Sequence, residues 1–395
     1  MHSSYTGLAA VDAPNLRAYS DPILFDSGPR NYCGCIDAKL TFGREQLPDT
    51  LSTVNYPDWP DRPAWPDRPT TAHFGPASWQ SSLLALLSAI FVRPVLAALT
   101  LLGLIVNRLR PDAMQRARLD VIDKPLRVIP ALPGTEVTPV ALPRCTAEWV
   151  VAPTAVGSER AIVYFHGSAL VTLGLNSHRR FVSKLSTATG AQVFNVGYRL
   201  APQVSIEEAV SDGVDAYRYV LSHGFAPHRI VLAGDSAGGL MAADTAIAAR
   251  DAGLPVPAGQ ALLSPLTSAD MSLKYRALKE HRDALFPFMT VKFIYDVFAT
   301  VNGTRPPPLM PPEAELHGLG PFLLQVGTHE MLLNDTFALA ERLRADNVPV
   351  WVQVWHKAMH MFQLTFDVNP DARAAVDEVA AFIRYATAVQ DELSA

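Results

Sequence analysis

Six consecutive residues, Gly234-Asp235-Ser236-Ala237-Gly238-Gly239, constrain the fold of this chain more than any other segment. They follow an apolar run at 230–233 and precede an alanine-rich stretch at 240–250 that has a helical pattern. A serine between a strand and a helix, with small residues on both sides, is typical of a very tight turn. Such a backbone is strained, and a Cβ beside the serine would clash with the strand or the helix. The segment therefore predicts a strand, a sharp turn that presents Ser236, and a helix.

The composition is that of a soluble protein of ordinary acidity. Hydrophobic residues make up 49% of the 395 residues, which is ample for a large core. The 33 basic and 38 acidic residues give a net charge of −5, which argues against nucleic acid as the main partner. The three cysteines, Cys33, Cys35 and Cys145, are a poor disulfide framework and favour a reducing compartment. Because the first 30 residues lack a basic start followed by an apolar core, we expect no secretory signal and a cytoplasmic protein.

Residues 1–78 differ from the rest of the chain. They are rich in proline, aspartate, serine and glycine, and they contain a tandem repeat of Trp-Pro-Asp-Arg-Pro at 59–63 and 65–69. Such a repeat indicates an extended, polyproline-like segment. We expect this extension to be poorly ordered or draped over the surface.

Residues 79–110 form the most apolar stretch. Within 83–106 the only charged residue is Arg93, so this run is long enough to span a bilayer, for which about 20 residues suffice. Arg93 at mid-span would cost roughly 2.5–3.5 kcal/mol, and Pro94 would break the run into two helices of ordinary length. We therefore favour an apolar helical cap over 79–125. A membrane span or a membrane-surface anchor is the alternative, and Arg108 and Arg110 would then keep the rest of the chain on the cytoplasmic side.

From residue 147 onward the pattern alternates between strand and helix. This alternation predicts an α/β fold over 126–395, with a mostly parallel central sheet and helices on both faces. The site of such a sheet lies at the carboxyl ends of its strands, and Ser236 directly follows one of them. The predicted strands are 148–151, 161–165, 192–196, 230–233, 261–264, 322–326 and 350–355, and the predicted helices are 179–189, 206–222, 240–251, 336–346 and 370–390.

A nucleophilic serine needs a base, and two histidines follow the predicted strand 350–355. His360 lies in a short loop with apolar neighbours, where a base is expected, so we choose it. His356 is closer to the strand end and is expected to be structural. The two histidines stand four residues apart, as zinc ligands on a helix can, but no H-E-x-x-H motif or third ligand accompanies them.

The group that orients the base should follow the strand 322–326. Glu330 lies on the loop after that strand and is our choice for this acid. Asp335 is the alternative, but it also suits the N-cap of the helix expected near residue 336. The acid would accept a hydrogen bond from the second ring nitrogen of the histidine and stabilise the imidazolium.

Backbone N–H groups near Ser236 would stabilise a developing oxyanion. One candidate is Ala237, the residue after the nucleophile, and the others are Gly167, Ser168 and Ala169 in the loop that ends the strand 161–165. Each preorganised donor can contribute ~2.7–4 kcal/mol. His166 opens the same loop, and we expect it to shape the loop and take no part in the reaction.

These residues resemble the hormone-sensitive-lipase-like carboxylesterases of the α/β-hydrolase superfamily. The resemblance covers roughly residues 145–390 and rests on four features. They are His166-Gly167, the segment Gly197-Tyr198-Arg199-Leu200-Ala201-Pro202, the turn at 234–239 and His360. The resemblance also supports Glu330, since the family's acid stands two residues before a leucine, here Leu332. The chain departs from the family at Ser168, where a second glycine is usual, and at Glu330, where aspartate is frequent.

The resemblance implies hydrolysis of carboxylic esters through an acyl-enzyme, with no cofactor and with an N-terminal helical cap over the acyl pocket. Ser236 would attack the ester, His360 would move the proton, and Glu330 would orient His360. The apolar cap together with Phe286, Phe288 and Phe298 suggests a small, apolar ester, although these rings would serve equally well in a core. Two alternatives stay open: a non-catalytic receptor for small ligands on the same fold, and a membrane-anchored lipid deacylase.

Overall fold

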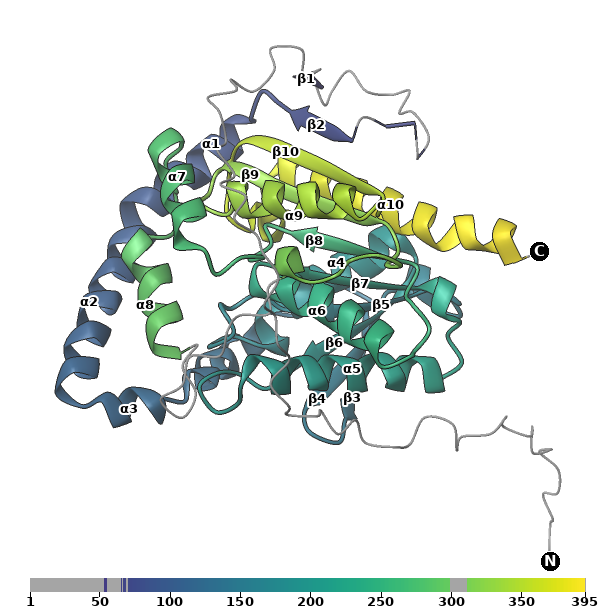
Figure 1. The fold of residues 1–395 in the computed structure, drawn as a ribbon, viewed down its shortest axis with the longest axis horizontal. Helices are drawn as coiled ribbons and strands as arrows, with labels where there is room; N and C mark the ends of the chain where they lie inside the picture. The colour runs from purple at the N-terminus through teal and green to yellow at the C-terminus, as the bar shows by residue number, and fades with distance from the viewer. Residues whose placement is uncertain (1–52, 55–64, 66, 69, 299–310, 395) are drawn as a thin grey trace, which may run out of the picture. The chain divides into compact units, whose positions relative to one another are not determined.

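The structure of the protein is a computed structural model, and it describes residues 53–54, 65, 67–68, 70–298 and 311–394. Within these residues ten strands form one sheet, which is parallel except for the two strand pairs at one edge. The predicted α/β class and mostly parallel sheet are confirmed (Figure 1). In spatial order the strands are β1 (Thr53–Val54), β2 (Thr71–Phe74), β10 (Val350–Met359), β9 (Phe322–His329), β8 (Gly259–Leu263), β7 (Ile230–Asp235), β5 (Ala161–Phe165), β6 (Gln192–Gly197), β4 (Thr146–Val151) and β3 (Glu136–Ala141).

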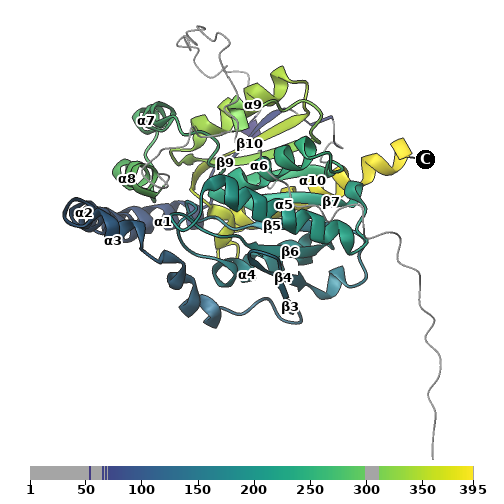
Figure 2. The ribbon, with the colours of Figure 1, turned by 60° about the horizontal axis from the view of Figure 1, so that its bottom comes forward.

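Helices cover both faces of the sheet, which explains why every residue of β5, β7 and β8 is buried. On one face α5 (Ile206–Ser222), α6 (Ala237–Asp251) and α9 (Leu333–Ala345) pack against the strands (Figure 2). On the other face lie α4 (Leu175–Thr189) and α10 (Pro370–Ser394), which contact each other and enclose a large apolar core. Local signals support these helices; at the start of α5, for example, Ser205 and Glu208 form a reciprocal capping box.

The strand register brings the sequence-predicted site residues to one edge of the sheet. Phe165 at the end of β5 is level with Gly234 in β7, and Gly234 is level with Leu262 in β8. Leu262 is in turn level with Leu324 in β9. The loops that follow these parallel strands therefore meet at their shared carboxyl ends.

Part of the N-terminal extension is built into the fold, so the expectation of a poorly ordered segment is wrong for the described residues up to 78. Strand β2 pairs in parallel with β10, and Phe74 stacks on Trp355 with ring centroids 4.3 Å apart. Arg68 forms a buried ion pair with Glu378 of α10. These aromatic and charged contacts fix the segment, whereas its composition alone suggested disorder. Residues 1–52 and 55–64, which include the first copy of the repeat, lie outside the described residues.

The apolar stretch folds as one continuous helix, and the predicted break at Pro94 is wrong. Helix α1 (Trp79–Leu87) passes through a π-helical turn (Ser88–Val92) into α2 (Arg93–Leu109). In the π turn the Arg93 N–H bonds to the Ser88 carbonyl, five residues back. This wider turn precedes Pro94, whose ring would clash with the carbonyl four residues earlier in a regular helix. After α2 come α3 (Pro111–Gln115) and a run of 3₁₀ turns (Leu119–Val128).

An insertion between β8 and β9 adds two helices next to the N-terminal helix, and we call these two helices together with Trp79–Leu109 the cap. It contains α7 (Met271–Glu280) and α8 (Phe288–Phe298), and α8 lies beside α2 in both views (Figures 1 and 2). Among the described residues, Trp79–Leu109 is the one segment long and apolar enough to cross a bilayer, judged by length and composition. Only 6% of its most apolar 18-residue window is buried.

Candidate active site

Ser236 stands at the turn between β7 and α6. Its backbone has φ 52° and ψ −120°, a strained conformation for a residue with a side chain. The turn is held in place by the Ser236 N–H, which donates to the Leu263 carbonyl of β8 at 2.8 Å. A Cβ at Gly238 would lie 2.0 Å from the Phe165 carbonyl oxygen, so glycine is required there. The turn thus places the Ser236 hydroxyl at the carboxyl end of the sheet, where the residue is 8% exposed.

His360 follows β10 and lies within hydrogen-bond distance of Ser236. Its Nε2 atom is 2.9 Å from the Ser236 Oγ atom, although the two residues are 124 positions apart in the chain. The histidine is only 3% exposed, so its ring is held by protein contacts and shielded from water. A base at this distance can accept the serine proton directly.

Glu330 completes the hydrogen-bonded chain. Its Oε2 atom lies 2.6 Å from His360 Nδ1. Its other oxygen, Oε1, accepts from the Ser264 hydroxyl at 2.8 Å and from the Gly327 N–H at 2.6 Å. The Ser264 hydroxyl also accepts from the N–H of Met361, the residue after His360, at 3.2 Å. The Ser264 hydroxyl therefore links the loop of Glu330 to the loop of His360, and it helps to fix both side chains.

The surroundings of His360 favour its protonated form. Burial alone would lower the pKa of His360, but the hydrogen bond and the charge of Glu330 oppose this effect. The charges of Asp283 and Asp235 act in the same direction, and the pKa of His360 is raised above its ordinary value. This environment stabilises the imidazolium that would form when Ser236 loses its proton.

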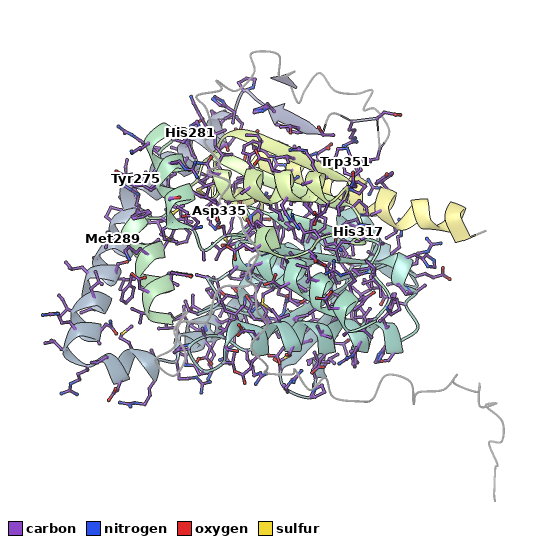
Figure 3. All side chains as sticks on the ribbon, in the orientation of Figure 1. Tyr275, His281, Met289, His317, Asp335 and Trp351 are labelled. Carbon is purple, nitrogen blue, oxygen red and sulfur yellow. The ribbon has the colours of Figure 1, made fainter. Side chains whose placement is uncertain are left out.

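The two alternatives weighed in the sequence lie outside this chain of contacts. Asp335, labelled in Figure 3, is buried and bonds through its carboxylate to Lys274 of α7, at 2.5 Å. Asp335 is also not the N-cap that the sequence suggested, because α9 begins two residues earlier, at Leu333, and Leu332 occupies the N-cap position. His356 is exposed on β10, where its side chain faces Gly75. The described residues contain no group of three or more histidine, cysteine, aspartate or glutamate side chains placed to hold a metal ion.

The loop after β5 differs from the prediction at one position. The Gly167 N–H donates to the Asp235 carboxylate at 3.0 Å, so it is engaged inside the protein and does not fit the predicted oxyanion role. No backbone carbonyl among the described residues accepts the N–H of Ser168 or Ala169. Ala237 is the first residue of α6, so its N–H has no partner within the helix. Ser168, Ala169 and Ala237 are thus the residues with N–H groups suited to an anion.

A buried network around Asp235 holds this loop, and the sequence analysis missed it. The Asp235 carboxylate accepts from the Tyr164 hydroxyl as well as from Gly167, and His178 Nε2 lies 3.4 Å from its second oxygen. Burial opposes the ionisation of Asp235, but His178, Tyr164 and the Gly167 N–H outweigh it and lower the pKa of Asp235. The ionised carboxylate of Asp235 therefore ties the loop of Gly167 to the turn of Ser236.

His166 has the loop-shaping position that the sequence predicted. Its ring stacks on Tyr198, with centroids 4.4 Å apart, and the Tyr198 hydroxyl donates to the His166 carbonyl at 2.7 Å. Burial, together with the charge of His178, lowers the pKa of His166 to about 4. His166 is therefore neutral at physiological pH and is not placed to exchange protons with Ser236.

The insertion between β8 and β9 contributes Asp283 and Phe286 to the site. Asp283 accepts from the N–H groups of Leu285 and Phe286 at 2.8 and 2.7 Å, and from the N–H of Met331 at 2.9 Å. It thereby joins the cap to the loop of Glu330. The Phe286 ring lies edge-on to His360, with centroids 5.4 Å apart. Of the three rings that the sequence singled out, Phe286 lies next to His360 and Phe288 contacts Tyr275 on α7. The side chain of Phe298 lies outside the described part of the chain.

Comparison with known proteins identifies the family of this chain. A family profile described as the alpha/beta hydrolase fold matches residues 162–364. This chain belongs to the hormone-sensitive-lipase-like carboxylesterases of that superfamily. As a member of these carboxylesterases it is a carboxylic ester hydrolase.

Individual relatives of this carboxylesterase align with about two thirds of its length. A carboxylesterase/phospholipase LipF of Mycobacterium tuberculosis is 36% identical over 285 residues, which are 68% of this chain and 74% of the relative. An acetyl-hydrolase of Streptomyces hygroscopicus is 34% identical over 255 residues, 65% of this chain and 84% of the relative. The crystal structure of EstE5 soaked with p-nitrophenyl butyrate has a TM-score of 0.62 and 32% identity, covering 72% of this chain and 98% of EstE5.

Proposed function

We propose that Ser236, His360 and Glu330 form the catalytic triad of this esterase. The observation that carries the proposal is the unbroken hydrogen-bonded chain from Ser236 Oγ through His360 to Glu330, with lengths of 2.9 and 2.6 Å. All three residues are buried, and each is fixed by the backbone of a different strand end. An alcohol of ordinary pKa becomes a nucleophile when a base in this position removes its proton in the transition state.

The reaction would proceed in two halves. The Ser236 oxygen attacks the ester carbonyl carbon while its proton passes to His360 Nε2. When the tetrahedral intermediate collapses, His360 returns this proton to the leaving alcohol, and the acyl group remains on Ser236. His360 then takes a proton from water, which attacks the acyl-enzyme, and the carboxylic acid leaves as Ser236 regains its proton. Throughout, Glu330 holds the tautomer of His360 and stabilises its charged form.

We assign the oxyanion site to the N–H groups of Ser168, Ala169 and Ala237. Asp235 supports this assignment because its bond to the Gly167 N–H fixes the loop next to the nucleophile turn. The side chain of Ser168 takes the place of a hydrogen atom in the usual glycine, but the N–H that the reaction needs is unaffected. Donors fixed in this way contribute most when charge develops on the carbonyl oxygen.

The substrate in this proposal is a small, apolar ester, and no cofactor takes part. Phe286 borders the base, and Phe293 and Val297 of α8 form an apolar cluster with Val171 and Ala201, against which Ala169 packs. The cluster lies next to the loop that holds Ala169, and it would contact an acyl or alcohol group bound at Ser236. We do not propose the receptor alternative, because a competent base lies at hydrogen-bond distance from the serine.

We further propose a cytoplasmic location with contact to a membrane surface through residues 83–106. Half-buried Cys145 is a free thiol, as a reducing compartment allows, and burial raises its pKa to about 12. A lipid deacylase would use the same chemistry, and the exposed apolar helix favours it as the second candidate.

The substitution Ser236→Ala tests the proposed nucleophile. It should lower kcat/KM for p-nitrophenyl butyrate at least about 10⁴-fold, because the remaining donors cannot replace the attacking oxygen. Circular dichroism and thermal unfolding should stay close to those of the wild type. Ser222→Ala, at an exposed position on α5, is the matched control and should retain full activity. Comparable hydrolysis by the two variants would remove Ser236 from the mechanism.

A further inference from the structure

The helix Trp79–Leu109 buries small and polar residues and exposes large apolar ones, the opposite of a usual surface helix. Its buried positions are the small or polar residues Ser81, Ala85, Ser88 and Thr100. Its exposed positions include most of its large apolar side chains. We call these side chains the outer face, represented by Leu86, Ile90, Phe91, Val95, Leu99 and Leu102.

This inversion identifies the kind of surroundings that the helix fits. A surface helix of a water-soluble protein turns its apolar side inward and its polar side to water. Here Phe91 is 64% and Leu99 58% exposed, in a continuous apolar surface of a kind that soluble monomers rarely display. Helices in contact with lipid show the arrangement found here, with small residues facing neighbouring helices and large apolar residues facing hydrocarbon.

The inner side of the helix packs closely against α8. The hydroxyl groups of Thr100 and Thr290 are 2.7 Å apart and form a buried hydrogen bond. A Cβ at Gly103 would lie 2.7 Å from the Phe293 ring, so glycine is what allows this approach. The small residues thus serve the contact within the protein, and the large ones are left for an external partner.

Helix α8 also determines how the helix lies relative to a bilayer. Lys292 and Asp296 of α8 form an ion pair, and both side chains are partly exposed. If Trp79–Leu109 crossed the bilayer, α8 beside it would carry this pair into hydrocarbon, where charged groups are strongly disfavoured. A helix that lies along the surface avoids this cost.

The charges around the cap complement an anionic surface. Although the whole chain has a net charge of −5, residues 93–127 contain seven basic and three acidic residues. Two of these acids are already engaged: Asp120 bonds to Arg118, and Asp123 caps the start of α4. Arg108, Arg110 and Arg116 are exposed near the end of the helix. Basic residues next to an apolar face are typical of helices that bind anionic lipid.

The inner side of the helix is also connected to the candidate active site. Phe293, which contacts Gly103 of the helix, belongs to the cluster with Val171 and Ala201. Ala169 of the oxyanion loop packs against the same cluster. A single layer of α8 therefore separates the exposed helix from the loop that would hold the substrate carbonyl.

We propose that the outer face binds the surface of an anionic lipid bilayer, with the helix parallel to the membrane, and that the enzyme takes lipid esters from this layer. The second part rests on the proposed function, since it uses the Ser236 site. The first part does not depend on catalysis. Membrane binding would place the cap, and the apolar cluster below it, next to the acyl chains of the substrate.

Flotation with vesicles of phosphatidylcholine containing about 30% phosphatidylglycerol tests the binding. The Ser236→Ala protein should float with these vesicles, which separates binding from hydrolysis. In the same background Leu99→Asn with Leu102→Asn should lower the bound fraction about tenfold or more. The matched control, Val156→Asn with Val368→Asn, removes two exposed apolar side chains outside the cap and should bind normally. Arg108→Gln with Arg110→Gln should weaken binding at low salt and leave little salt dependence.

Each outcome bears on the proposal. Hydrolysis of soluble p-nitrophenyl butyrate should be unchanged by the leucine and arginine substitutions in the active protein, whereas hydrolysis of vesicle-borne esters should fall. Failure of Ser236→Ala to float, or equal flotation of the leucine variant and its control, would overturn the proposal. So would a dimer in solution that the leucine substitutions dissociate, because a second copy would then cover the face. Resistance of membrane-bound protein to alkaline carbonate would indicate a span and would also overturn it.

Discussion

The central sheet and the cap helix Trp79–Leu109 bury opposite kinds of residue. In β5 and β9 the aliphatic side chains Ile162, Val163 and Leu324 are fully buried. In the cap helix Leu101 is 61% and Leu109 76% exposed, whereas Ser81 and Thr100 are buried. Apolar runs of similar composition are therefore buried in one region of this chain and exposed in another. In the sheet they fill the core, and in the helix they form a surface that suits a partner outside the protein.

Two carboxylates that follow β9, those of Glu330 and Asp335, also differ in what they contact. Both Glu330 and Asp335 are buried, but Glu330 bonds to His360 and Asp335 bonds to Lys274 of α7. One carboxylate would therefore act in the reaction, and the other would hold the cap to the sheet domain.

The largest expected effect distinguishes these two carboxylates. Glu330→Gln should lower kcat for a soluble ester about 10³- to 10⁴-fold, because the amide no longer stabilises the imidazolium and can hold the wrong tautomer. Asp335→Asn should keep the rate within about one order of magnitude, because this residue does not contact His360. Steady-state kinetics of both purified variants gives the comparison.

The free energy of unfolding should be affected more by Asp335→Asn than by Glu330→Gln, the reverse of the order expected for activity. Asp335→Asn removes the carboxylate of a buried ion pair and leaves the Lys274 side chain without this partner, which should lower the free energy of unfolding by about 3–5 kcal/mol. Urea denaturation of both variants measures this difference. If Asp335→Asn loses more activity than Glu330→Gln while remaining folded, the acid has been assigned to the wrong residue.

The next prediction compares leucines of the sheet and of the cap helix. Leu324→Ala should lower the free energy of unfolding by about 2–5 kcal/mol, since it leaves a cavity in the core. Leu101→Ala removes the same atoms from an exposed position and should change this free energy by no more than about 0.5 kcal/mol. Urea unfolding without detergent is the measurement. Equal destabilisation by the two substitutions would mean that the outer surface of the cap is buried in the isolated protein.

A smaller effect concerns pH. His360 must be neutral to accept the serine proton, and its pKa is raised above its ordinary value by Glu330 and two further carboxylates. We therefore expect kcat/KM to fall as the pH drops through a value above 6.5, the ordinary pKa of histidine. In Glu330→Gln the main source of this increase is removed, and the acid limb of the residual activity should move to lower pH. An acid limb that stays in place would assign it to another group.

The proximity of Ser236, His360 and Glu330 was largely predictable from the sequence, because short motifs place these residues. The turn at 234–239 needs small residues for steric reasons, and the order of strands places His360 and Glu330 at the same edge of the sheet. The bond of the Gly167 N–H to Asp235 was not predictable from a motif. This bond depends on how the loop after β5 meets the turn after β7.

The parts of the fold that were missed lack a local signal. Strand β2 has four residues, and its place in the sheet depends on the Phe74–Trp355 stack, which no local pattern reveals. The π turn before Pro94 replaces the expected break because the carbonyls can shift to bonds of wider spacing. Asp283 and Ser264 are ordinary polar residues in the sequence, and only the folded chain shows that they hold the loops of Glu330 and His360.

Mass spectrometry of the acylated protein tests the central claim most directly. After rapid acid quench of a reaction with p-nitrophenyl butyrate, the wild-type protein should carry one butyryl group, located on the peptide that contains Ser236. The same peptide from Ser236→Ala should carry none, and Glu330→Gln should acquire the group far more slowly. Hydrolysis by a wild-type protein that never acylates Ser236, or a butyryl group on another residue, would contradict the account.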